Sequence, residues 1–91
     1  MKNSQPNIKI YTTKNCPFSK KMKDFLYDNE LVFEEVDIGT DKDKIEECFN
    51  VSGVISTPVL VVTNSLMRTL ALSGWNEDNR NLIGTLLNLL S

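Results

Sequence analysis

Apolar residues alternate with polar ones, or form short continuous runs, in four stretches of the chain. Stretches of this kind that are bounded by turn residues are typical of strands. The pattern predicts strands at residues 8–12, 31–37, 59–63 and 66–72. The third run is continuously apolar, which is typical of a central strand buried on both faces. The turn signal Asn64-Ser65 separates it from the fourth, so we expect these two strands to be antiparallel.

Three other stretches place apolar residues at helical spacing. A first helix is predicted at residues 17–29, because Pro17 fits the first turn, where a missing N–H costs nothing. A second is predicted to start from a cap at Thr40 or Asp41 and to stop at Gly53. Its apolar positions are Ile45, Cys48 and Phe49. The last helix carries a stripe that we expect to be core rather than a partner surface, formed by Leu82, Ile83, Leu86, Leu87 and Leu90.

The predicted order is therefore β-α-β-α-β-β-α. With 91 residues, one domain over residues 1–91 is expected, beginning with a flexible lead-in at 1–7. Helices can then cover both faces of a four-stranded mixed sheet, which makes the fold class α/β.

Composition narrows the function classes. The net charge is −2 and the lysines are scattered, so no basic face for nucleic acid is predicted. No apolar run approaches the length of about 20 residues that spans a bilayer, and residues 1–7 lack a signal-peptide core. We therefore expect a cytoplasmic chain with no membrane partner, in which two cysteines are not a disulfide scaffold. The chain has no histidine, which excludes Cys-His nucleophile pairs and histidine metal sites within it.

Cys16 lies between the first predicted strand and the first predicted helix. A thiol at the amino end of a helix meets unpaired N–H groups and the positive end of the helix dipole, and both favour the thiolate. Lys14, Lys20 and Lys21 lie near in sequence and act in the same direction. Because the thiolate is the nucleophile of disulfide exchange, this position indicates redox chemistry. The alternative is a cysteine that merely precedes a helix.

Four segments in order along residues 8–90 resemble the glutaredoxin family, which has the thioredoxin fold. They are the strand and active-site turn at 11–19, the strand at 33–37, the glycine-containing segment at 52–59 and the turn at 73–78. Each motif alone is weakly specific, but the ordered set is specific. The resemblance implies a four-stranded mixed sheet flanked by three helices, and a cis peptide bond before Pro58.

The resemblance also implies roles for single residues. Cys16 would be the nucleophile that attacks a protein–glutathione mixed disulfide, with glutathione as co-substrate and no metal. The residues that would bind glutathione are Lys14, Phe18, Thr57, Pro58, Gly74, Trp75 and Asn76. Lys14 would meet the glycine carboxylate, and the backbone of Thr57 would pair with the glutathione cysteine as an added strand does. The turn at 74–76 would receive the γ-glutamyl end.

Ser19 stands where dithiol glutaredoxins have a second cysteine. Serine forms no disulfide, but its hydroxyl can donate a hydrogen bond to the Cys16 thiolate, so we expect Ser19 to be catalytic as well. This favours a monothiol route, in which Cys16 takes the glutathionyl group and a second glutathione releases it. The alternative is that Ser19 is an engineered replacement, made to trap a mixed disulfide.

The turn before the last helix departs from the family pattern too. Ser73 replaces one of two paired glycines, and Asn76-Glu77 replaces an acidic pair, so weaker glutathione binding is expected. Phe18 replaces the more usual tyrosine and lacks its hydroxyl. The sequence Ser73-Gly74-Trp75 also resembles the Ser-Gly-Phe turn of NrdH-type redoxins, which take electrons from thioredoxin reductase. Those proteins need two active-site cysteines, so Ser19 counts against this alternative.

Two side chains have competing interpretations. We interpret Cys48 as a buried structural cysteine that shares a face with Ile45 and Phe49, rather than as a distant resolving thiol. Trp75 either packs over the last helix or touches a substrate.

We therefore expect a glutathione-dependent thiol–disulfide oxidoreductase that acts through Cys16 in electron transport and cell redox homeostasis. The expected partners are glutathione and glutathionylated or disulfide-containing proteins, with thioredoxin reductase in the alternative, and the chain is expected to be a monomer. Two other hypotheses stay open. One is a glutathione-ligated iron–sulfur scaffold, which the stiff Pro17 disfavours, and the other is an interaction module with little turnover.

Overall fold

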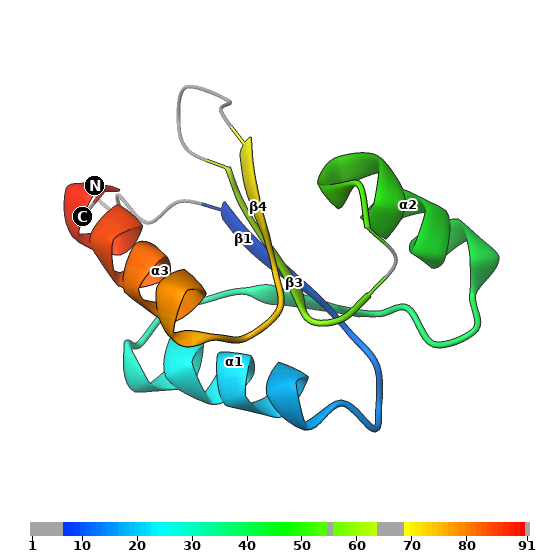
Figure 1. Ribbon diagram of the computed structural model, residues 1–91, viewed down its shortest axis with the longest axis horizontal. Coiled ribbons are helices and arrows are strands. Elements are labelled where there is room, and N and C mark those ends of the chain that lie inside the picture. Colours follow the sequence, from blue (N-terminus) through cyan, green and yellow to red (C-terminus); the bar gives the residue numbers. More distant parts are fainter. Residues whose placement is uncertain (1–6, 55, 64–68, 91) are drawn as a thin grey trace.

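The computed structural model describes residues 7–54, 56–63 and 69–90, with only the backbone for 86–90 (Figure 1). The strands are β1 (Asn7–Thr12), β2 (Glu34–Asp37), β3 (Val59–Thr63) and β4 (Thr69–Ser73). The helices are α1 (Pro17–Asp28), α2 (Lys42–Ser52) and α3 (Glu77–Leu90). The predicted order of strands and helices is confirmed in this part of the chain.

The sheet has the strand order β2-β1-β3-β4. β1 pairs in parallel with β2 and antiparallel with β3, and β3 pairs antiparallel with β4. The sheet is thus mixed, as expected, and the predicted antiparallel pairing of the last two strands is confirmed. The register of the central pair sets Ile10 opposite Leu60 and Tyr11 opposite Val59.

The helices lie on both faces of this sheet, with α1 and α3 on one face and α2 on the other (Figure 1). Between the sheet and the α1/α3 layer is a cluster of Ile8, Ile10, Met22, Leu26, Leu60, Val62, Leu72 and Ile83. Between the sheet and α2 is a second cluster of Tyr11, Ile38, Cys48, Val59 and Val61. β3 contributes alternate residues to both clusters, which confirms that it is a central strand buried on both faces.

Strand β2 begins three residues later than predicted, because Glu30 and Leu31 form the C-terminal cap of α1. The Leu31 N–H donates to Leu26 O at 3.0 Å, and the Glu30 N–H donates to Tyr27 O at 2.9 Å. This is the Schellman arrangement, with Glu30 (φ 57°) in the left-handed position that glycine usually takes. Strand β4 begins at Thr69 among the described residues, so the predicted start at residues 66–68 lies outside them.

The capping predictions for α2 are confirmed at both ends. Asp41, rather than Thr40, is the N-cap, since its carboxylate accepts from the backbone N–H groups of Asp43 and Lys44. Gly53 (φ 79°) ends the helix, and its N–H donates to Phe49 O.

Two predicted core positions are wrong. Phe49 is 48% exposed and Leu82 is 42% exposed. Phe49 follows Cys48 by one position, and Leu82 precedes Ile83 by one position. Cys48 is the buried residue of α2, and Ile83 is the buried residue in the part of α3 whose side chains are described. One residue along a helix corresponds to a rotation of 100°, which turns Phe49 and Leu82 away from the sheet. The other predicted stripe residues, Leu86, Leu87 and Leu90, lie outside the residues whose side chains the structure describes. No helix in the described part of the chain is both long and apolar enough to cross a membrane.

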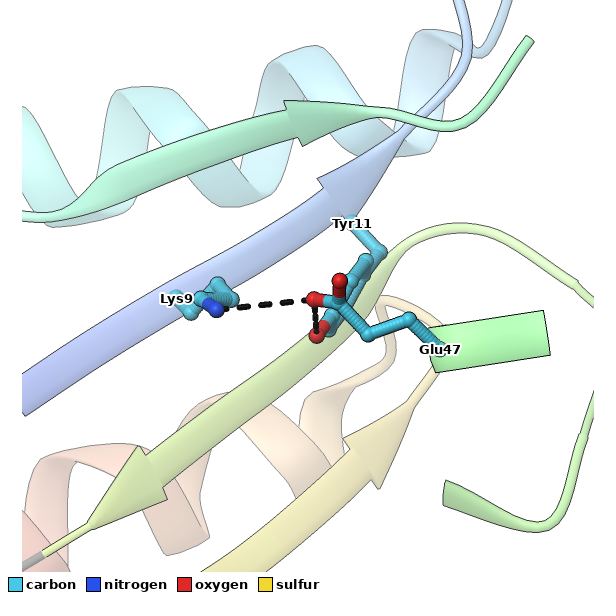
Figure 2. Close-up of polar contacts among 3 residues, drawn as sticks. All are labelled: Lys9, Tyr11 and Glu47. Atoms are coloured by element: carbon cyan, nitrogen blue, oxygen red, sulfur yellow. Dashed lines mark hydrogen bonds and ion pairs between the residues drawn. The ribbon is translucent and has the colours of Figure 1, made fainter. Parts of the chain in front are cut away.

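A polar contact fixes α2 to the sheet (Figure 2). The Tyr11 hydroxyl donates to the Glu47 carboxylate, and Lys9 Nζ lies 3.5 Å from the same oxygen. The hydrogen bond from Tyr11 is the main cause that lowers the pKa of Glu47, with burial opposing it and Lys9 assisting it. Burial and the neighbouring carboxylate raise the pKa of Tyr11 far above its usual range. The contact therefore joins an ionised carboxylate to a buried, neutral phenol.

We predict that Tyr11→Phe lowers the free energy of unfolding by about 1 kcal/mol at neutral pH, the net worth of one such hydrogen bond to a half-exposed carboxylate. The folded-state pKa of Glu47 is depressed, so this stability is present above the ordinary carboxyl pKa and is lost as the pH falls through the folded value. The difference between the two proteins should therefore shrink as the pH falls below the ordinary carboxyl value of about 4.3 and through the lower folded value. Urea unfolding at a series of pH values measures the difference.

Tyr27→Phe is the matched control, because Tyr27 is 64% exposed and the same hydroxyl is removed in solvent. It should leave the free energy of unfolding nearly unchanged at every pH. A loss in Tyr11→Phe that is the same at acid and neutral pH would show that the contact with Glu47 is not its cause.

Candidate active site

Cys16 is the N-cap residue of α1, as predicted from Pro17. Its backbone is extended (φ −106°, ψ 103°), and its carbonyl accepts from the N–H groups of Ser19 at 3.1 Å and Lys20 at 3.3 Å. Its side chain does not cap the helix and is half-buried. The thiol is therefore held at the amino end of the helix dipole and remains open to a reactant.

A second segment, distant in sequence, meets Cys16 at this point. The Cys16 thiol donates to Thr57 O at 3.6 Å, and the hydroxyls of Thr13 and Thr57 are 3.2 Å apart. The Thr57–Pro58 peptide bond is cis, as the family resemblance implies. The pairing of Tyr11 with Val59 brings these segments together, since one leaves β1 where the other enters β3.

Opposing effects act on the pKa of the Cys16 thiol. Burial is the largest single effect and raises the pKa. Donors that can stabilise the thiolate, namely the side chains of Ser19 and Thr57 and the backbone N–H groups of Ser19 and Phe18, together outweigh burial and lower the pKa below its ordinary value. The neutral thiol donates to the Thr57 carbonyl, whereas the thiolate can only accept, so ionisation exchanges one set of partners for another.

Ser19 has an unusual environment. The residue is only 2% exposed, and its hydroxyl has no hydrogen-bond partner among the described residues. A buried hydroxyl without a partner costs about 1–3 kcal/mol, and this cost is relieved when a charged acceptor forms beside it. The interaction of Ser19 with the ionised sulfur lowers the pKa of Cys16. The Ser19 hydroxyl can therefore donate a hydrogen bond to the Cys16 thiolate once the thiol ionises.

The turn before α3 reaches the same place. The Gly74 N–H donates to Pro58 O at 2.8 Å, and the hydroxyls of Ser56 and Ser73 are 3.3 Å apart. Gly74 has φ 88°, a conformation that glycine adopts readily. Among the residues expected at the site, these contacts connect Cys16, Ser19, Thr57, Pro58 and Gly74.

Lys14 and Phe18 lie on the solvent side of the site. Lys14 is exposed in the turn before Cys16 and makes no ion pair with any residue that the structure describes. The Phe18 ring is 51% exposed, and Lys21 Nζ lies 5.7 Å from its centre. Both side chains are accessible to a ligand.

Trp75 and Asn76 have structural partners instead. The Trp75 ring lies 5.5 Å from the ring of Phe25 on α1 and packs against the α1/α3 cluster, which favours the packing interpretation. Asn76 is the N-cap of α3, because its side-chain oxygen accepts from the Asn79 N–H at 2.8 Å and its carbonyl accepts from Arg80. The side-chain oxygen of Asn76 is therefore already engaged.

The sequence interpretation missed several residues that hold this site. Thr13 contacts Thr57, and Asn79 contacts the turn before α3. The spacing Asn76-x-x-Asn79 resembles a capping pattern and was an available signal. Buried Thr12 donates to Glu35 at 2.7 Å, which is the main cause that lowers the pKa of Glu35; Lys23, at 3.1 Å, assists it. No local pattern indicates this second group of contacts.

Cys48 is fully buried, as predicted, in the cluster beneath α2. Burial raises the pKa of its thiol, and neither cysteine is in a disulfide. These features are those of a structural cysteine rather than of a resolving thiol. In the described residues there is no group of three or more His, Cys, Asp or Glu side chains that could hold a metal ion.

Comparisons with known proteins agree with this geometry. The model of the glutaredoxin family matches residues 8–67. A glutaredoxin-like protein of the rubredoxin operon of Clostridium pasteurianum is 32% identical over 60 residues, which cover 66% of this chain and 80% of that protein. The crystal structure of a glutaredoxin from Archaeoglobus fulgidus, 28% identical, covers 86% of each chain with a TM-score of 0.68.

The NrdH-redoxin of Escherichia coli has the same fold. It is 22% identical and covers 85% of this chain and 93% of its own, with a TM-score of 0.62. These similarities show that the architecture described above is the thioredoxin fold.

We predict that Ser19→Ala raises the pKa of Cys16, because it removes a donor to the thiolate. The rate of alkylation by iodoacetamide, measured against pH, should shift to higher pH. Ser52→Ala is the matched control. Ser52 is also a serine in a helix, but it lies at the end of α2, where its hydroxyl donates to Cys48 O and Val54 O. An unshifted profile in Ser19→Ala would remove Ser19 from the activation of the thiol.

Proposed function

The chain belongs to the glutaredoxin family, and we propose that it reduces protein–glutathione mixed disulfides through Cys16 by a monothiol route. Its fold and family are those of a thiol-dependent redox protein. The observation that carries the proposal is the Cys16 thiol, whose pKa is lowered at the amino end of α1 beside the backbone of Thr57. We further propose glutathione as co-substrate and the cytoplasm as the compartment.

Two exchange steps make up the reaction. The Cys16 thiolate attacks the glutathione sulfur of the mixed disulfide, a new S–S bond forms at Cys16, and the substrate protein leaves as a thiolate that takes up a proton. The thiolate of a second glutathione then attacks the glutathione sulfur bound to Cys16. Cys16 leaves as a thiolate, and oxidised glutathione carries away the oxidising equivalents.

A monothiol route is favoured because no second thiol is available to Cys16. Ser19 occupies the nearby helix position, and Cys48 is fully buried beneath α2. Release of Cys16 therefore needs a thiol from solution. The hydroxyl of Ser19 stabilises the Cys16 thiolate as a leaving group in the second step, since a thiol of lower pKa leaves faster.

Glutathione would be bound across the open side of the site. The exposed ammonium of Lys14 would meet its glycine carboxylate, the Phe18 ring would flank it, and the backbone of Thr57 would pair with its cysteine. The γ-glutamyl end would reach the turn at 74–76. Asn76 stands where the family has the first residue of an acidic pair, and its side-chain oxygen already accepts from the Asn79 N–H, which supports the expectation of weaker binding.

A redoxin reduced by thioredoxin reductase is the second candidate. It is favoured by the turn Ser73-Gly74-Trp75 and by the packing of Trp75 on Phe25, which removes that ring from the glutathione site. It needs a second thiol near Cys16, and Ser19 does not supply one.

The test is reduction of a glutathionylated peptide with glutathione and glutathione reductase. We expect turnover by the unsubstituted protein, turnover also by Ser19→Cys, and loss to background in Cys16→Ser. Turnover only in Ser19→Cys, or only with thioredoxin reductase, would contradict the monothiol proposal. Activity retained in Cys16→Ser would contradict the assignment of the nucleophile.

We predict that Lys14→Ala raises the KM for glutathione by up to about fivefold, the worth of one exposed ion pair. The free energy of unfolding should change by less than about 0.5 kcal/mol, because Lys14 is an exposed turn residue. Steady-state kinetics and urea unfolding separate the two effects. Lys42→Ala, at the exposed start of α2, is the charge-matched control and should leave the KM unchanged.

A further inference from the structure

Asn79, in the first turn of α3, is the residue that holds the turn before that helix. Its side-chain amide donates to two successive carbonyls, Ser73 O and Gly74 O, both at 2.9 Å. Its backbone N–H donates to the side-chain oxygen of Asn76 at 2.8 Å. The side chain is half-buried, so solvent competes only in part for these bonds. Three hydrogen bonds from one residue therefore attach this turn to α3.

The Ser73–Gly74 peptide group is consequently held from both sides. Its carbonyl accepts from the Asn79 amide, and its N–H donates to Pro58 O at 2.8 Å. The two groups point in opposite directions across a planar trans peptide, so fixing one orients the other. Asn79 also holds the carbonyl of the next peptide, Gly74–Trp75, where the conformational freedom of glycine would otherwise allow rotation. Pro58 and Asn79 together thus fix how the turn faces the loop that contacts Cys16.

We propose that Asn79 is a positioning residue that sets the preference of this site for the γ-glutamyl group. The inference rests on the proposed function, because the turn at 74–76 is the segment that would receive this group. Asn79 acts by holding the backbone of the turn in one orientation, and it is not itself required to touch the substrate. Attack by Cys16 on a disulfide without a γ-glutamyl group should not depend on it.

The test compares two mixed disulfides of the same peptide, one with glutathione and one with cysteinylglycine, which lacks only the γ-glutamyl group. The rate constant for release of the peptide thiol by the reduced protein is measured for each in a single turnover. The unsubstituted protein should react faster with the glutathionyl peptide. In Asn79→Ala this preference should fall about fivefold, the equivalent of one net hydrogen bond, with the cysteinylglycine rate unchanged.

Asn79→Asp separates hydrogen bonding from charge, since it also removes the two donors but adds a carboxylate. The preference should fall in both variants, and a fall in Asn79→Asp alone would overturn the proposal by assigning the effect to charge. Asn29→Ala is the matched control. Asn29 donates from its amide to Phe25 O at 2.8 Å, at the far end of α1, so its loss measures the general cost to the fold.

The outcomes also distinguish a failure of this inference from a failure of the proposed function. If the unsubstituted protein shows no preference for the glutathionyl peptide, the proposed binding of glutathione at the turn 74–76 is wrong, and the inference fails with it. If that preference exists and Asn79→Ala retains it, the function stands and the role of Asn79 is overturned. An equal fall of both rates in Asn79→Ala would also overturn it, since it would show a general structural effect.

Discussion

The antiparallel pairing of β1 with β3 is the constraint on which the site depends. Because Tyr11 lies opposite Val59, the chain leaving β1 passes beside the chain entering β3. The contacts of Thr13 and Cys16 with Thr57 follow directly from this register. A slip of one residue would reverse every side chain between the two faces of the sheet, so the apolar residues that fix the core also fix the site.

Burial and hydrogen bonding have opposite effects on the pKa of the Cys16 thiol. Burial disfavours the thiolate, but the same low dielectric strengthens the bonds from Ser19, Thr57 and the first N–H groups of α1. The two cysteines illustrate the difference. Cys16 is half-buried among donors and has a lowered pKa, whereas burial raises the pKa of Cys48. Reactivity is therefore a property of position, and only one of the two thiols has the position for it.

Much of the fold could be predicted from local signals. Period-two and helical spacing gave the strands and helices, Pro17 gave the start of α1, and Asp41 and Gly53 gave the ends of α2. The predicted start of β2 is three residues too early. Glu30 occupies the left-handed position after α1 that glycine usually fills, so no glycine in the sequence marks the end of the helix.

The candidate site could be predicted in part. The structure brings Cys16, Ser19 and the segment before Pro58 together, and each of these was predicted from a motif that is contiguous in sequence. The contacts of Thr12 with Glu35 and of Tyr11 with Glu47 join residues more than twenty positions apart. They follow from the register of the strands and from the position of α2 on the sheet. Asn79 spans a short distance in sequence, but its bonds depend on the direction that the turn takes after β4.

The most direct test of the central claim is to treat the reduced protein with oxidised glutathione and to locate the adduct by peptide mapping and mass spectrometry. The account predicts one glutathionyl group on Cys16, none on Cys48, and its release by reduced glutathione. An unmodified Cys16, or an adduct that forms first on Cys48, would contradict the account.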